Sequence, residues 1–156
     1  MLEQIGGLPL HPLLIHAAVV FVPLLALASL AYALVPGLRA RIWWAVGLLA
    51  LAGAGSAVLA RFSGVAFKAR LIRKHLASPQ ILDKVSAHQH FGNMTMYVTL
   101  ALAAVTLLSL WLVGRQGGNR VVQAVNAVVV VILAVVTVYY CYRAGDSAAR
   151  IVWAGY

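Results

Sequence analysis

The chain has 156 residues, of which 63% are apolar and only 10% are charged. Soluble domains average about 45–50% apolar and about 25% charged residues, so this composition excludes an ordinary soluble domain. Lys and Arg outnumber Asp and Glu by 12 to 3, which gives a net charge of +9. The basic residues lie between apolar segments, as in membrane proteins whose loops meet anionic headgroups, so we expect no nucleic-acid partner.

Four apolar segments are each long enough for a helix that crosses the hydrocarbon core of a bilayer, which takes about 20 residues. They cover residues 13–35, 42–60, 94–113 and 121–142. We therefore predict one all-α integral membrane domain, residues 1–156. It is a four-transmembrane-helix bundle with both termini on one face, which we name side A; the opposite face is side B. The N-terminus has no signal-peptide pattern, so we expect the first helix to remain in the mature protein.

The first two segments carry signs of how they pack. Pro23 lies in the middle of the first segment and predicts a kink, because it removes a backbone hydrogen bond. In the second segment small residues recur at four-residue spacing, in the pairs Ala50 and Ala54, Gly53 and Ala57, and Ala52 and Ser56. This spacing lets two helix backbones approach closely, so we predict a central packing helix here.

The long connector between the second and third segments, residues 61–89, is basic and amphipathic. Its apolar residues alternate with basic ones in a roughly helical pattern: Val65, Phe67, Leu71, Ile72 and Leu76 with Lys68, Arg70, Arg73 and Lys74. This pattern predicts an amphipathic helix that lies on the membrane surface. Ser78 and Pro79 then predict the beginning of a further helix that runs on into the third span.

The distribution of basic residues predicts the orientation. Side A carries eight of them, namely Arg61, Lys68, Arg70, Arg73, Lys74, Lys84, Arg143 and Arg150, and side B carries Arg39, Arg41, Arg115 and Arg120. Cytoplasmic loops are enriched in Lys and Arg, so we predict that side A and both termini are cytoplasmic.

Several classes of function are disfavoured. No Asp, Glu, Lys or Arg lies in the middle of a predicted span, where transporters and pumps generally need one. The chain has neither a phosphate-binding glycine loop nor a Cys-x-x-Cys pair. We therefore expect no transporter or intramembrane hydrolase, and no enzymatic activity from this chain alone.

Histidine is the residue type that points to chemistry, and all five histidines fall on side A: His11, His16, His75, His88 and His90. His16 lies inside the first span, where a neutral imidazole needs a hydrogen-bond partner or a metal. His88 shares a helical stripe with Gly92, which leaves space beside it. Two imidazoles from different helices are the axial ligands of a b-type haem, so we predict His16 and His88 as this pair, with His11 and Gly92 nearby.

Two other interpretations remain open. Soft metals accept histidine, methionine and cysteine, so copper or zinc could bind a set drawn from His90, Met94, Met96 and Cys141. Alternatively, the histidines are structural and the protein is a cofactor-free accessory subunit. In that case the small-residue face of the second span or the smooth face of the fourth span docks a larger complex. Every interpretation places the chain in a lipid bilayer, with other membrane subunits as expected partners.

Both ends of the chain carry distinctive motifs. Residues 8–16 contain the pattern His-Pro-x-x-x-His, and residues 144–153 begin with Ala-Gly-Asp and end with Val-Trp. They resemble the opening and the ending of the bacterial membrane family catalogued as domain of unknown function 2231, and His88 with Gly92 matches a histidine before its third helix. Ala148 departs from the family, whose ending often has glycine there.

The resemblance covers the whole chain and implies the four-helix layout. Its site residues carry over only at His11, His16 and His88. Members accompany electron-transfer proteins, which implies a redox or haem role. We therefore expect a small subunit of a redox assembly in the bacterial cytoplasmic (inner) membrane.

Overall fold

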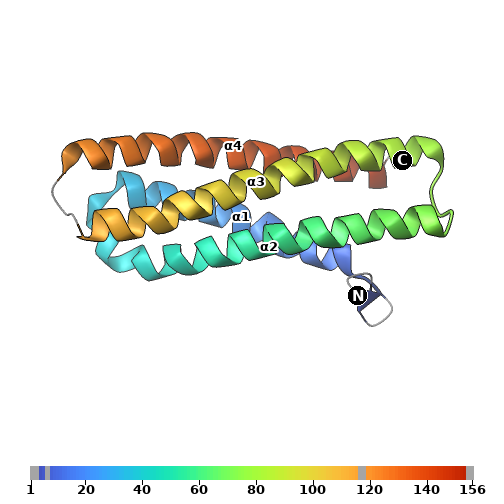
Figure 1. Cartoon of the computed structure of the whole chain (residues 1–156), viewed down its shortest axis with the longest axis horizontal. Helices are drawn as coiled ribbons and strands as arrows, with labels where there is room; N and C mark the ends of the chain where they lie inside the picture. The colour runs from blue at the N-terminus through green and yellow to red at the C-terminus, as the bar shows by residue number, and fades with distance from the viewer. Residues whose placement is uncertain (1–3, 6–7, 116–118, 154–156) are drawn as a thin grey trace.

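The computed structural model describes residues 4–5, 8–115 and 119–153 and is a bundle of four long helices (Figure 1). The helices are α1 (Leu10–Leu34), α2 (Arg39–Arg73), α3 (Pro79–Arg115) and α4 (Arg120–Val152). A short 3-10 helix, η1 (Pro36–Leu38), joins α1 to α2, and an antiparallel pair of two-residue strands, β1 (Gln4–Ile5) and β2 (Leu8–Pro9), precedes α1. The all-α four-helix prediction is confirmed, with the small hairpin as an addition.

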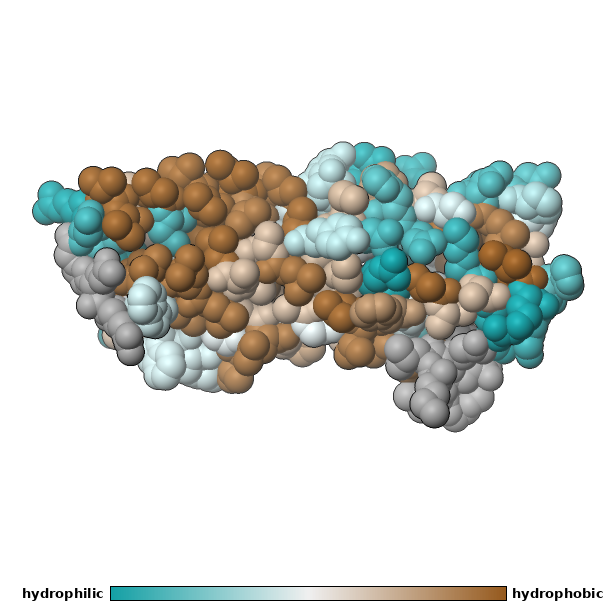
Figure 2. Space-filling view, viewed as in Figure 1, coloured by the Kyte–Doolittle hydropathy of each residue, from teal (hydrophilic) through white to brown (hydrophobic). Residues whose placement is uncertain are grey.

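Both ends of the chain and the α2–α3 connection lie at one end of the bundle, which is side A (Figure 1). All four helices are long and apolar enough to cross a membrane. However, α2, α3 and α4 have 35, 37 and 33 residues, so each is about 50–55 Å long. The hydrocarbon core is only about 30 Å thick. Figure 2 shows the result: the surface is apolar over the side B part of the bundle and largely hydrophilic toward side A.

Exposed tryptophans Trp43, Trp44 and Trp111 mark the side B edge of the apolar surface, as interfacial aromatic belts do. Phe62 on α2 and Phe91 on α3 lie about 20 residues from these tryptophans, in the direction of side A. A helix of about 20 residues spans a hydrocarbon core. We name the level of Phe62 and Phe91 the side A boundary. The helices continue beyond it by three to four turns, so side A carries a helical head outside the apolar belt.

The small-residue face of α2 packs against α1, as predicted. Gly53 is buried, and a Cβ atom added there would lie 3.0 Å from Leu25 Cδ2 and 3.4 Å from the Phe21 carbonyl oxygen. A side chain at this position would push Leu25 or the α1 backbone away by a few tenths of an ångström. The central core below it consists of small and aliphatic side chains from all four helices: Leu25, Ala26, Ala33, Ala50, Leu102, Ala103, Val130 and Ala134.

The structure does not confirm a separate amphipathic surface helix between the second and third spans. Residues 65–73 continue α2 as its last turns, and the helix ends near His75, whose positive φ of 50° breaks the helical geometry. This segment contacts α3 through a basic side chain, since Lys68 Nζ donates to Ser86 Oγ at 2.9 Å, whereas the apolar Ile72 is exposed. Ser78 caps α3 as predicted, since its Oγ accepts from the Ile81 N–H at 3.4 Å.

A substitution at Gly53 tests the close approach of α1 and α2. We expect Gly53→Ala to lower the free energy of unfolding by about 1–3 kcal/mol, because Leu25 and the α1 backbone must move to admit a methyl group. Gly55→Ala is the matched control, since a Cβ there meets nothing within 4 Å. It should leave the stability unchanged or raise it slightly. Thermal unfolding of both variants in the same detergent makes the comparison, and equal losses would contradict this packing.

Candidate functional site

The structure brings His11 and His88 together at side A. Their ring centroids are 6.4 Å apart, with an angle of 63° between the ring planes. His11 lies in the first turn of α1, and His88 lies in the third turn of α3. Because α1 and α3 each pack against both α2 and α4, they are diagonal in the bundle. The two rings therefore meet edge-on across the bundle axis.

Residues of α2 hold the ring of His11. Its Nδ1 lies 3.0 Å from Ser63 Oγ, and that hydroxyl donates its own proton to the Ala60 carbonyl at 2.9 Å. The hydroxyl therefore accepts from His11, so the imidazole proton lies on Nδ1. The ring stacks on Phe67 with a centroid distance of 6.0 Å and an interplanar angle of 26°. It also fills the space beside Gly64, where a Cβ would lie 3.1 Å from the imidazole Cε1.

Residues of α4 hold the ring of His88 in the same way. Its Nδ1 lies 3.1 Å from the Ala144 carbonyl oxygen and 2.9 Å from Ser147 Oγ. A carbonyl only accepts, so the proton of His88 also lies on Nδ1. In both rings Nε2 is then left with its lone pair. Orientation through a hydrogen bond at Nδ1 is how proteins prepare histidines to ligate metals.

The pair lies at the level of the lipid headgroups. His88 precedes Phe91, at the side A boundary, by about one turn, and both rings are half-buried. Two basic groups lie at this level: the Arg143 guanidinium is 4.5 Å from the centroid of the Phe91 ring, and Lys68 Nζ donates to Gln89 Oε1 at 3.1 Å. Two imidazolium charges this close to each other would repel, so the arrangement suits neutral rings.

The structure places His16 apart from this pair. Its side chain is exposed, and its Nδ1 forms a hydrogen bond with the Pro12 carbonyl oxygen of its own helix. Five residues separate it from His11, which turns it about 140° around the helix axis. The ring that contacts His88 is therefore that of His11, and a ligand role for His16 stays a prediction. Beside His88, a Cβ added at Gly92 would meet nothing within 4 Å, so there is space at this position.

The residues considered for copper or zinc lie in different places. His90 is exposed, and its ring meets Phe91 edge-on at 5.8 Å. Met94 is half-buried, Met96 belongs to a core cluster, and Cys141 packs against that cluster. Among residues 8–115 and 119–153, no group of three His, Cys, Asp or Glu side chains is arranged to hold a metal ion.

The sequence interpretation missed a line of buried hydroxyl groups that continues the His88 face of α3 into the membrane. It consists of Thr95, Thr99, Thr106 and Ser109. Thr106 Oγ1 lies 2.8 Å from Ser29 Oγ on α1, and Ser109 Oγ donates to Asn126 Oδ1 on α4. Successive members of this line are four, seven and three residues apart, and Thr95 follows His88 by seven residues. This helical spacing is the sequence pattern that indicates one shared face of α3.

The fold and the site together define the class of this protein. It is an all-α membrane protein with four helices able to cross a bilayer and a histidine pair at one end of the bundle. The chain belongs to the family described as "Predicted membrane protein (DUF2231)", whose model matches residues 7–155. This confirms the family resemblance of the terminal motifs. Neither the curated proteins nor the solved structures gave a match to the chain.

A substitution at His88 tests its role as a link between α3 and α4. We expect His88→Phe, which keeps a ring but removes the donor, to lower the free energy of unfolding by about 1 kcal/mol, the usual net value of such a hydrogen bond. His90→Phe is the control, because His90 lies two residues away and is exposed. Thermal unfolding in detergent measures both variants. A similar stability for the two would show that His88 does not link the helices.

Proposed function

We propose that this protein is a small subunit of an electron-transfer assembly in the bacterial cytoplasmic membrane, and that His11 and His88 are the axial ligands of a b-type haem. The observation that carries the proposal is the pair itself. Two imidazoles from diagonal helices meet edge-on, and each is oriented through Nδ1 so that Nε2 keeps its lone pair. Bis-imidazole ligation between helices is a common way for bundles to hold haem iron.

The rings are close enough for both to contact one bound group, because their centroids are 6.4 Å apart. Gly92 follows His88 by one turn, and the open space at its missing side chain is where the edge of a flat cofactor could lie. A bound haem would supply one-electron chemistry, which the side chains of this chain do not provide.

The test is an absorption spectrum of the oxidised and dithionite-reduced protein, purified in mild detergent from cells supplied with haem. We expect a Soret band, a reduced α band and one iron per chain. His11→Ala and His88→Ala should each abolish the bands, whereas His90→Ala, the exposed neighbour of His88, should retain them. His16→Ala decides between the two pairings: loss of the bands in this variant, with retention in His11→Ala, would favour His16 as the ligand.

The other outcomes identify the alternative functions. Copper or zinc in the purified protein without a Soret band would indicate a metal-binding protein and overturn the haem proposal. A protein with neither haem nor metal would indicate a cofactor-free accessory subunit. In that case the docking face would lie on α4, because the small-residue face of α2 is buried against α1. The exposed apolar residues of α4 include Val121, Val125, Val128, Ile132 and Val135.

The orientation of the bundle is tested with reporter fusions. The basic head on side A favours a cytoplasmic location for both termini. We therefore expect a fluorescent protein fused after Tyr156 to fluoresce and alkaline phosphatase at the same position to be inactive. The same two reporters inserted in the side B connector, residues 114–119, should give the reverse result. Active phosphatase after Tyr156 would overturn the assignment of side A to the cytoplasm.

A further inference from the structure

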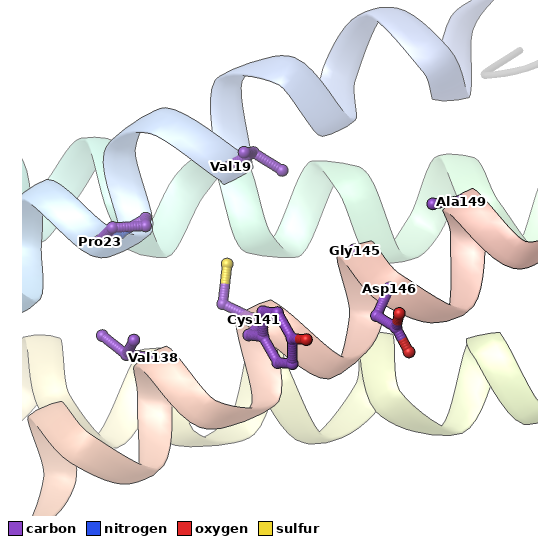
Figure 3. A pocket seen from close by; sticks show the side chains of 8 residues that line it. Val19, Pro23, Val138, Cys141, Gly145, Asp146 and Ala149 are labelled. Atoms are coloured by element: carbon purple, nitrogen blue, oxygen red, sulfur yellow. The ribbon is translucent and has the colours of Figure 1, made fainter.

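A groove of about 430 Å³ runs between α1 and α4 on the outside of the bundle (Figure 3). Its apolar walls come from Val19 and Pro23 on α1 and from Val138 and Cys141 on α4. Val19 and Val138 are 55% and 44% exposed, so the groove opens onto the surface that faces lipid. It is separate from the histidine pair, because His88 contacts the other face of α4, at Ala144 and Ser147.

The groove runs from inside the apolar belt to beyond the side A boundary. Its lining on α4 extends from Val138 to Ala149, which is about 16 Å along the helix axis. On α4 the boundary lies near Arg143, whose guanidinium is 4.5 Å from the centroid of the Phe91 ring. Pro23, at the inner end, lies near the middle of α1, so the groove ends within the side A leaflet. A partner helix would cross both leaflets, so a groove that ends within one leaflet fits a lipid chain better.

The outer end of the groove carries charges of both signs. Asp146 lines it beside Gly145, as Figure 3 shows, and the Asp146 carboxylate accepts a hydrogen bond from Arg150 Nε at 2.8 Å. Two turns before Arg150, Arg143 is held by the Tyr139 hydroxyl, with Nη1 donating at 2.8 Å. A carboxylate between two guanidinium groups complements a headgroup with an ammonium group and a phosphate.

We propose that this groove binds one acyl chain of an aminophospholipid from the side A leaflet. The lipid ammonium group interacts with Asp146, and its phosphate interacts with Arg150. Val138 and Cys141 line the path of the chain inside the apolar belt, and Gly145, which has no side chain, leaves room at the outer end of the groove. This site does not depend on haem at the histidine pair, so each proposal stands or fails by itself.

Native mass spectrometry tests the lipid site. The full-length protein is equilibrated in mixed micelles with phosphatidylethanolamine and phosphatidylglycerol of equal chain length. We expect one retained phosphatidylethanolamine per chain, about tenfold in excess over phosphatidylglycerol, because an ammonium–carboxylate hydrogen bond is charge-assisted. Equal retention of both lipids, or a preference for phosphatidylglycerol, would overturn the headgroup assignment.

Two variants locate the site. Gly145→Leu fills the groove and should abolish the retained lipid, whereas Gly55→Leu makes the same change on an exposed face of α2 and should not. A Cβ at either glycine meets nothing within 4 Å, so both variants should fold. Asp146→Asn should keep a bound lipid but lose the preference for phosphatidylethanolamine. Lipid retention by Gly145→Leu equal to that of the unmodified protein would show that the groove is not the site.

Discussion

A bilayer offers about 30 Å of hydrocarbon to a helix, and α2, α3 and α4 exceed this by about 20 Å each. The excess lies on side A, where it forms a helical head at and beyond the level of the headgroups. Within hydrocarbon, a buried polar side chain is costly unless it is satisfied, and charged ones are rare. At the headgroup level such groups are tolerated, which is why the histidines, Lys68 and Arg143 gather there.

The two halves of the bundle are held by different interactions. Lipid tails are as apolar as leucine, so helices in the membrane associate through close packing and hydrogen bonds rather than through a hydrophobic effect. Gly53 against Leu25 and the Ser29–Thr106 hydrogen bond are of this kind. In the head, side-chain hydrogen bonds join neighbouring helices, from His11 to α2 and from His88 to α4. These bonds also fix the two rings in edge contact with each other.

The histidine pair and the lipid groove occupy the same end of the molecule but different faces of α4. Ala144 and Ser147 hold His88, whereas the exposed Gly145 and the half-buried Asp146 line the groove on another face of α4. A cofactor at the pair would therefore lie at the edge of the side A leaflet, about one helix diameter from a bound lipid.

The number of spans, the cap at Ser78 and the small-residue face of α2 followed from the sequence, because each depends on a local property: apolar length, N-cap chemistry or residue size. The pairing of His88 with His11 rather than His16 was decided by tertiary structure. In a membrane helix the lipid-facing and core-facing sides are equally apolar, so hydrophobic periodicity does not show which face points inward. Five residues turn the helix by about 140°, and only the packed bundle shows which of the two rings faces the axis. The basic and apolar pattern of residues 65–73 resembled a separate surface helix, but these residues continue α2 to Arg73.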